Sequence, residues 1–293
     1  MTTRFVHAEN RYLVPFDGSY DTAKAPTSPP KKERDDETNS TLLSEAIEKL
    51  NKLQARLLAS DSRSLLLVFQ AMDAAGKDGT IRAVMTGINP AGCEVTNFKR
   101  PSELDLDHDF LWRVHARTPE RGRIGIFNRS HYEEVLVVRV HPQILDVQRI
   151  PHMPTPKKVW NERYESIRDL EKHLARNGTT ILKFFLHVSK EEQKKRFLTR
   201  IDDPEANWKF EAGDIRERRH FDDYMTAYED ALNETSRPYA PWYSVPADDK
   251  KYMRRIVAET IVETLQRMDL HYPVATEEAR LGMLAAKKEL LAE

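Results

Sequence analysis

Ser64-Leu-Leu-Leu-Val-Phe-Gln70 runs directly into Ala71-Met-Asp-Ala-Ala-Gly-Lys-Asp-Gly-Thr-Ile-Arg82, and this junction decides the fold. The first stretch is a short continuous apolar run, which is typical of a parallel strand buried on both faces. The second stretch contains glycines and a lysine and leads into a helical pattern. A strand, a glycine-containing loop, a lysine and then a helix are the context of a phosphate-binding loop.

The predicted loop supplies what an anionic phosphate needs. Backbone N–H groups of the loop and of the following helix N-terminus point at one spot, and the helix dipole favours negative charge there. Gly76 and Gly79 allow the backbone to approach phosphate oxygens closely, and Lys77 adds a mobile positive charge. We therefore predict phosphate binding by Ala74, Ala75, Gly76, Lys77, Asp78, Gly79, Thr80 and Arg82.

The match to the pattern G-x-x-x-x-G-K-[ST] is imperfect, because Ala71 replaces the first glycine and Asp78 replaces the metal-binding hydroxyl residue. An ordinary strand-to-helix turn with a surface lysine is the alternative interpretation. It does not explain Asp73, a carboxylate inside a loop that should attract anions. Asp73 fits if it holds Mg²⁺ against the phosphates, with Mn²⁺ as a substitute ion.

A second polar cluster, from Asn128 to Glu134, follows the apolar run Arg123–Phe127. Ligands of open parallel sheets bind at the carboxyl ends of the strands, where this cluster is predicted to lie. Arg129 is placed to hold a phosphate with two hydrogen bonds. Glu133 and Glu134 open a predicted helix, where their alternative role is a favourable interaction with the helix N-terminus.

Basic and acidic residues alternate densely from Lys190 to Asp223. Arg196 and Arg200 are four residues apart on one predicted helix and therefore share a face; Arg216 follows after a break. A solvated helical hairpin with many ion pairs is one interpretation. The other is a lid at about 190–223 that closes over phosphates, excludes water and delivers arginines. Its place after a strand and a capped helix favours the lid.

Further strands and helices are predicted along the chain. Apolar runs predict strands at 94–98, 123–127, 181–188 and 242–246. Helical patterns are predicted from Thr41, from Ser102 through Trp112, after Thr155-Pro156, after Ser189 and around 256–268. Alternating strands and helices indicate an α/β fold with a mostly parallel sheet covered on both faces. Residues 1–40 are predicted to be an extended arm, 41–272 the folded domain and 273–293 a helical tail.

Composition limits the possible functions. The 293 residues carry a formal net charge of −1 with a pI near 6.8, which argues against a general polyanion-binding surface, so any basic site must be local. The single cysteine, Cys93, forms no intrachain disulfide. No apolar run approaches the roughly 18 residues of a membrane span, and the start of the chain lacks a signal-peptide core. A cytoplasmic protein without membrane contact is expected.

Several blocks of sequence, in one order, resemble the polyphosphate kinase 2 family over about residues 41–270. These blocks are Met72-Asp-Ala-Ala-Gly-Lys-Asp-Gly-Thr-Ile81, Phe98-Lys-Arg-Pro-Ser102, His108-Asp-Phe-Leu-Trp-Arg113, Ile126-Phe-Asn-Arg-Ser-His-Tyr-Glu133, Arg200-Ile-Asp-Asp-Pro204 with Asn207-Trp-Lys-Phe210, and Pro241-Trp-Tyr243. The resemblance implies a three-layer α/β/α P-loop kinase fold of the thymidylate-kinase-like kind, with a helical lid. It also implies a homo-oligomer, either a dimer or a tetramer.

The resemblance implies transfer of a phosphoryl group from inorganic polyphosphate to AMP, ADP or both, giving ADP or ATP. The residues expected to be catalytic are Asp73, Lys77, Arg129 and Arg200. Nucleotide binding is expected of Asn97, Lys99, Arg100, Asn128, Arg129 and Glu133. Asn128 stands where one branch of the family has an aspartate, so Asp73 and Glu134 are the expected metal ligands. Arg196, Arg200 and Arg216 are expected to contact polyphosphate.

Two other functions stay open at this point. A nucleotide kinase that uses ATP as donor would share the loop and the lid, and would need a pocket for the donor adenine, which leaves little trace in a sequence. A module that binds polyphosphate or nucleic acid without turnover is the third possibility. The presence of Asp73 together with Lys77, and the near-zero net charge, argue against that third function.

Overall fold

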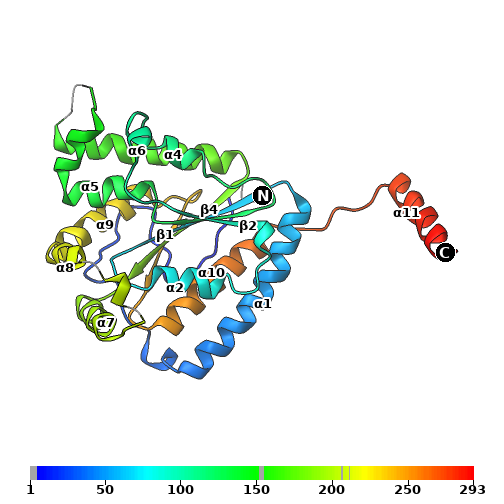
Figure 1. Cartoon of the computed structure of the whole chain (residues 1–293), viewed down its shortest axis with the longest axis horizontal. Coiled ribbons are helices and arrows are strands. Elements are labelled where there is room, and N and C mark those ends of the chain that lie inside the picture. Colours follow the sequence, from blue (N-terminus) through cyan, green and yellow to red (C-terminus); the bar gives the residue numbers. More distant parts are fainter. Residues whose placement is uncertain (1–4, 152–154, 206, 211) are drawn as a thin grey trace.

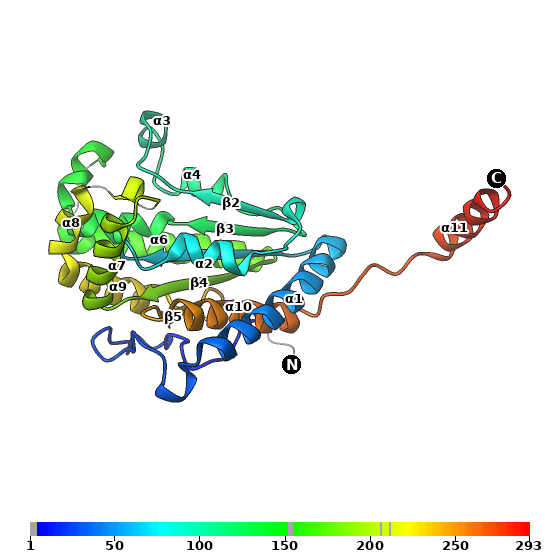
Figure 2. The same cartoon turned by 60° about the horizontal axis from the view of Figure 1, so that its bottom comes forward.

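A parallel sheet forms the centre of the molecule. The computed structural model describes residues 5–151, 155–205, 207–210 and 212–293. Within them, five parallel strands lie in the order β2-β3-β1-β4-β5 (Figures 1 and 2). The strands are β1 (Ser64–Ala71), β2 (Cys93–Asn97), β3 (Ile124–Asn128), β4 (Thr179–His187) and β5 (Trp242–Pro246). The predicted α/β class with a parallel sheet is confirmed.

Helices cover both faces of the sheet, so the molecule has three layers. Helices α1, α2 and α10 lie on one face, and α4, α5, α6 and α9 lie on the other (Figure 1). The helices are α1 (Asp36–Ser60), α2 (Lys77–Val84), α3 (Glu103–Leu106), α4 (Trp112–His115), α5 (Val137–Val140), α6 (Pro156–Arg176), α7 (Lys190–Asp202), α8 (Ala212–Arg219), α9 (Phe221–Thr235), α10 (Lys250–Arg267) and α11 (Glu277–Leu290).

The apolar run of β1 is buried because β1 is the central strand of the sheet. Leu65, Leu67, Val68 and Phe69 have no exposed surface, since neighbouring strands flank them and helices pack above and below. A strand buried on both faces must be apolar along its whole length. This is why the stretch that decides the fold could be recognised without periodicity.

Two helix predictions need correction. Helix α1 begins at Asp36, not at Thr41, because the Asp35 carboxylate accepts a hydrogen bond of 2.7 Å from the Thr38 N–H and caps the helix. The helix predicted from Ser102 through Trp112 is two short helices, α3 and α4. Between them the Asp109 side chain accepts a hydrogen bond of 2.9 Å from the Leu111 N–H. An aspartate that bonds the nearby backbone in this way competes with a continuous helix.

The N-terminal segment lies along the edge strand β5. The Val14 N–H donates to Trp242 O (2.9 Å), and the Ser244 N–H donates to Tyr12 O (2.9 Å). These bonds pair the otherwise free edge of the sheet, which limits pairing with other chains. Residues 1–4 of the predicted arm lie outside the described residues.

The C-terminal helix α11 stands apart from the body of the molecule (Figures 1 and 2), and all of its residues are exposed. Over the part of the chain that the structure describes, no helix is both long and apolar enough to cross a membrane.

Candidate active site

The predicted phosphate-binding loop connects β1 to α2. Gly76 has φ +101°, a conformation that favours glycine, and it caps the N-terminus of α2. Ala74 is also left-handed, with φ 62°. The Thr80 hydroxyl is buried and donates to Gly76 O (2.9 Å), so it faces the protein and not the mouth of the loop. The phosphate-binding prediction for Thr80 therefore does not extend to its side chain.

Arg196 of α7 braces this loop from behind. Its guanidinium donates to Ala75 O (2.7 Å) and Ala74 O (3.2 Å), and also to Ala247 O (2.6 Å) and Asp248 O (3.1 Å). The side chain is 8% exposed. Four of its hydrogen bonds go to main-chain carbonyls, and its Nε pairs with Glu192 at 2.9 Å. Arg196 therefore holds the loop in place, which differs from the predicted contact with polyphosphate. Gln193 supports the same loop through a 3.0 Å hydrogen bond to Asp73 O.

The loop and the end of β3 form one charged cluster. Strands β1 and β3 are neighbours, with Phe69 opposite Asn128, so the segments that follow them meet. An Arg129 Nη atom lies 3.2 Å from Asp73 Oδ1, and the Asn128 amide donates to Asp78 Oδ1 (2.6 Å). Arg129 has φ 62°, and its N–H donates to Phe69 O (3.2 Å). The structure thus brings together Asp73, Lys77, Asp78, Asn128, Arg129 and Glu133.

The charges of this cluster influence one another. Burial lowers the pKa of Lys77, and the nearby Arg129 lowers it further, against the opposing effect of Glu133, Asp78 and Asp73. Burial also raises the pKa of Glu133, whose carboxylate accepts a 2.9 Å hydrogen bond from Gln70. For Arg129, burial works to lower the pKa, but Glu133 and Asp73 overcome it and raise the pKa. Perturbed groups grouped in this way are typical of functional sites.

Glu134, the second predicted metal ligand, lies elsewhere. It is 4% exposed, and its Oε2 accepts hydrogen bonds from Arg163 (2.9 Å) and Gln148 (2.7 Å). A buried carboxylate that is already neutralised by an arginine is a poor metal ligand. The pairing of Glu134 with Arg163 therefore argues against the predicted metal ligation, which stays a prediction. Among the described residues, no group of three or more His, Cys, Asp or Glu side chains is arranged to hold a metal ion.

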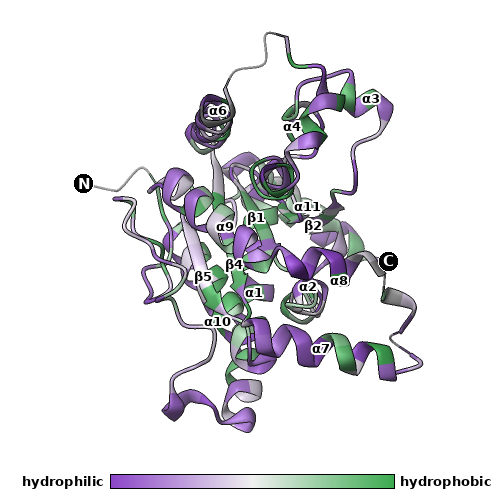
Figure 3. Ribbon diagram, turned by 90° about the vertical axis from the view of Figure 1, so that its left-hand side faces the viewer, coloured by the Kyte–Doolittle hydropathy of each residue, from purple (hydrophilic) through white to green (hydrophobic). Residues whose placement is uncertain are grey.

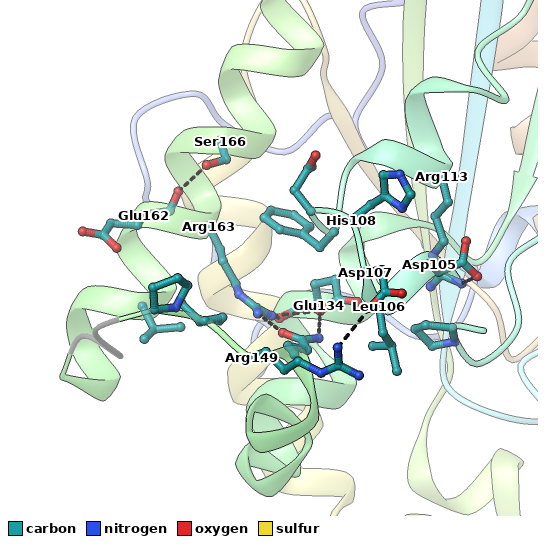
Figure 4. A pocket seen from close by; sticks show the side chains of 17 residues that line it. Asp105, Leu106, Asp107, His108, Arg113, Glu134, Arg149, Glu162, Arg163 and Ser166 are labelled. Carbon is teal, nitrogen blue, oxygen red and sulfur yellow. Dashed lines mark hydrogen bonds and ion pairs between the residues drawn. The ribbon is translucent and has the colours of Figure 1, made fainter. Parts of the chain in front are cut away.

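A cavity of about 500 Å³ opens on the side of Glu134. Its walls come from residues 101–113, from the turn around Arg149 and from α6, and they include Asp105, Phe110, Arg113, Glu134, Arg149 and Arg163. Figure 4 shows Arg163 directed from α6 toward Glu134, with Arg113 and Asp105 across the cavity. Aromatic and charged groups mixed in one concave site are typical of small-molecule binding.

Sequence reasoning missed this cavity, although His108–Arg113 is one of the blocks that carry the family resemblance. The predicted nucleotide-binding residues Asn97, Lys99 and Arg100 do not line it. They are exposed at the carboxyl end of β2, where Lys99 O accepts a 2.8 Å hydrogen bond from Arg113. The remaining predicted nucleotide residues, Asn128, Arg129 and Glu133, lie at the loop.

The segment predicted to be a lid contains α7, α8 and the start of α9, with residues 206 and 211 outside the described part. Helix α8 is hydrophilic along most of its length (Figure 3). Arg216 is exposed on it. Arg200 lies 3.4 Å from Asp214, which links α7 to α8. Movement of this segment stays a prediction.

Arg196 and Arg200, one helical turn apart, should respond differently to substitution. Arg196→Ala leaves several main-chain carbonyls without a buried donor, so we expect stability to fall by on the order of 3 kcal/mol. Arg200→Ala removes a single ion pair worth about 1 kcal/mol or less, so the melting temperature should stay close to that of wild type while kcat falls. Thermal unfolding and turnover of both variants check this. Equal melting temperatures for the two variants would contradict the bracing role of Arg196.

Three features together define a P-loop kinase-like phosphotransferase. They are the parallel sheet, the glycine-capped loop that carries a lysine, and the arginine and carboxylate groups that face each other beside it. The family model described as Polyphosphate kinase 2 (PPK2) matches residues 32–273. The chain belongs to the polyphosphate kinase 2 family.

Individual relatives agree. The chain is 56% identical over 251 residues to the ADP-polyphosphate phosphotransferase of Rhodopseudomonas palustris, covering 85% of this chain and 87% of the relative. It is 50% identical over 225 residues to the AMP/ADP-polyphosphate phosphotransferase of Meiothermus ruber, covering 77% and 80%. The crystal structure of Polyphosphate Kinase 2 from Arthrobacter aurescens superposes with a TM-score of 0.84 at 36% identity, covering 94% and 93% of the two chains.

Proposed function

We propose that this protein transfers a phosphoryl group from inorganic polyphosphate to ADP, AMP or both. The observation that carries the proposal is a cluster of cations beside the phosphate-binding loop, consisting of Arg82 on α2 and Lys250 and Arg254 on α10, called here the basic cluster. One Nη atom of Arg254 lies 3.2 Å from the position that a side chain at Gly79 would occupy. The basic cluster is therefore in direct contact with the start of α2.

The basic cluster is electrostatically unbalanced. Burial lowers the pKa of Arg254, and Arg82 and Arg196 lower it further. Burial also lowers the pKa of Lys250, as do Arg196 and Arg254, against the opposing effect of Glu192. In the described part of the chain, none of the three side chains forms an ion pair or a hydrogen bond. Like charges held together without ion pairs favour an anionic ligand. A polyphosphate chain, with a charge on every unit, fits this better than the neutral adenine of an ATP donor.

We propose that the acceptor nucleotide binds in the cavity of about 500 Å³. Phe110 offers an aromatic ring to a base. The arginines of the wall, Arg113, Arg149 and Arg163, pair with Asp105, Asp107 and Glu134, so a nucleotide phosphate would compete with these carboxylates. The turn His131–Val135 joins this cavity to the loop, because Glu134 lines the cavity while the neighbouring Glu133 bonds Gln70 of β1. Donor and acceptor would thus approach one another across this turn.

The chain's own residues perform transfer by positioning and by charge neutralisation, because phosphoryl transfer needs little covalent help from the protein. The amides of the loop and Lys77 hold the donor end, and Arg129 faces the same spot from the end of β3. Both cations oppose the negative charge that spreads over the transferred group. The half-buried setting strengthens these interactions relative to those in bulk water.

A magnesium ion fits at Asp73. Mg²⁺ keeps several waters and is commonly held by one or two carboxylates together with substrate phosphates, so a preformed cluster of three carboxylates is not required. Asp73 is partly exposed at the mouth of the loop, beside Arg129. When bound there, the ion would supply positive charge that reduces the repulsion between the phosphate groups.

A single assay tests the proposed function. The purified protein is mixed with Mg²⁺, long-chain polyphosphate and either ADP or AMP, and the nucleotides are separated and quantified. New ATP from ADP, or new ADP from AMP, without any added ATP is the expected result. Transfer that occurs only when ATP replaces polyphosphate would instead identify an ATP-dependent nucleotide kinase. Binding of polyphosphate with no transfer in any mixture would identify a binding module.

The basic cluster supports a separate prediction. Arg82→Ala and Arg254→Ala should each raise the KM for long polyphosphate by about tenfold, since a hydrogen bond to a charged group contributes on the order of 1.5–3 kcal/mol. The KM for the nucleotide should not change. Lys251→Ala is the matched control, because Lys251 lies on the same helix but pairs with Asp36 at 3.0 Å. Equal effects of all three substitutions on the KM for polyphosphate would count against the basic cluster.

A homo-oligomeric state and a cytoplasmic location stay predictions from the sequence and the family resemblance. Light scattering coupled to size-exclusion chromatography measures the first directly, and a monomer at the concentration used in the assay would contradict it.

A further inference from the structure

A charged network lies in the core directly beneath the turn that carries Glu133 and Glu134. Lys183 of β4 is fully buried, and its ammonium donates to Glu171 Oε2 (2.7 Å), to the Tyr132 hydroxyl (2.8 Å) and to Thr235 O (2.9 Å). Tyr132 in turn donates to Glu171 Oε1 (2.7 Å). Every donor of the Lys183 ammonium therefore has a partner, and both oxygens of Glu171 are bonded.

Stability alone does not explain this network. Removing two charges from water is costly, and a buried ion pair can often be replaced by apolar side chains without loss of stability. Burial lowers the pKa of Lys183 to about 8, against the attraction of Glu171, which indicates how unfavourable the site is for an ammonium. The surroundings are otherwise apolar and aromatic, with the rings of Tyr132 and Trp242 each 5.2 Å from the Lys183 nitrogen. A simple apolar core would fill this space.

The network is connected to the reaction site through Tyr132. Tyr132 belongs to the short turn His131–Val135, in which successive side chains leave in different directions. Tyr132 enters the core, Glu133 reaches Gln70 beside the loop, and Glu134 reaches Arg163 in the cavity wall. A small rotation of this turn would therefore move the groups that face the donor and those that face the acceptor together.

We infer that Lys183 and Glu171 are positioning residues, which fix the turn His131–Val135 through the Tyr132 hydroxyl and so align Arg129 and Glu133 with the acceptor cavity. The inference rests on the proposed function, because that function gives the two sites their roles. His131 lies close enough to be an alternative partner for Glu171. Its ring nitrogens have no hydrogen-bond partner, and its Nε2 lies 3.8 Å from Glu171 Oε1. In a variant without Lys183, we expect Glu171 to turn toward His131, which belongs to the same turn.

Three variants test this inference. Lys183→Met leaves Glu171 unpaired, and we expect the melting temperature to fall by on the order of 10 °C. The double variant Lys183→Met/Glu171→Leu removes both charges and should recover most of that loss. Tyr132→Phe removes only the hydroxyl group, and its melting temperature should fall less than that of Lys183→Met, because Lys183 and Glu171 still pair with each other. In all three variants kcat should fall by about tenfold or more, because small displacements of reacting groups are costly, while the KM for polyphosphate stays unchanged.

Recovery of stability without recovery of kcat distinguishes positioning from simple stabilisation. A double variant that regains both the melting temperature and kcat would overturn the inference. An unchanged kcat in Tyr132→Phe would also overturn it, and this variant can be measured even if the lysine variants fail to fold. Ser64→Ala is the matched control. It removes a buried 3.0 Å hydrogen bond to Thr179 at the opposite end of the same strands, so it should lower the melting temperature without lowering kcat.

A crystal structure of the double variant separates failure of this inference from failure of the proposed function. We expect Arg129 and Glu133 to be displaced relative to the loop, whichever reaction the wild-type protein performs. Unmoved side chains would overturn the positioning role even if polyphosphate proves not to be the donor.

Discussion

Lys77→Met should lower kcat by about 10³-fold or more while the protein stays folded. Lys77 lies at the first position of α2, among Asp73, Asp78, Arg129 and Glu133, and is partly buried. The ammonium of Lys77 would neutralise the negative charge that develops on the transferred group. The thioether of methionine carries no charge and cannot do this. Methionine keeps the length and the apolar stem of the lysine, so the loop should keep its conformation.

The measurement is single-turnover transfer from polyphosphate at saturating nucleotide, accompanied by thermal unfolding. Lys49→Met, an exposed lysine on the outside of α1, is the control for loss of one positive charge and should leave kcat unchanged. A Lys77→Met protein that retains activity within tenfold of wild type would contradict a catalytic role of the loop.

Asp73→Asn should give the second largest effect, about 10²-fold or more in kcat together with a raised requirement for Mg²⁺. The amide preserves the size of the side chain and retains an oxygen toward Arg129, which lies 3.2 Å from Asp73 in the wild-type protein. What it loses is the negative charge that would hold the ion. We therefore expect the Mg²⁺ concentration for half-maximal rate to rise by about tenfold or more.

Glu134→Gln is the informative comparison for Asp73→Asn, because the sequence made both residues candidate ligands. Glu134 pairs with Arg163 at 2.9 Å, so its substitution should lower thermal stability and leave the Mg²⁺ concentration for half-maximal rate unchanged. Rates measured over a magnesium titration distinguish the two variants. A shift in the magnesium dependence for Glu134→Gln, with none for Asp73→Asn, would reverse the assignment.

The errors of the sequence-based predictions share a cause. Glu133 and Glu134 are adjacent and chemically identical, and only the geometry of the turn His131–Val135 sends one to the loop and the other to the cavity wall. Arg196 and Arg200 share a helical face, as predicted, yet only Arg196 reaches the main-chain carbonyls of the loop. Periodicity predicts the face of the helix on which a side chain lies. It does not predict which group of the folded protein that side chain contacts.

The sequence by itself determined the parallel sheet, the loop at residues 71–80 and the family resemblance. Each of these leaves a trace in short stretches of sequence. A strand buried on both faces must be apolar along its length, and a loop with φ +101° at Gly76 favours glycine. The tertiary structure alone decided which charged side chains lie close together. The basic cluster joins Arg82 to Lys250 and Arg254, and the core network joins Lys183 to Glu171 and Tyr132. Solvation and charge pairing depend on segments far apart in the chain, and only the folded structure brings those segments together.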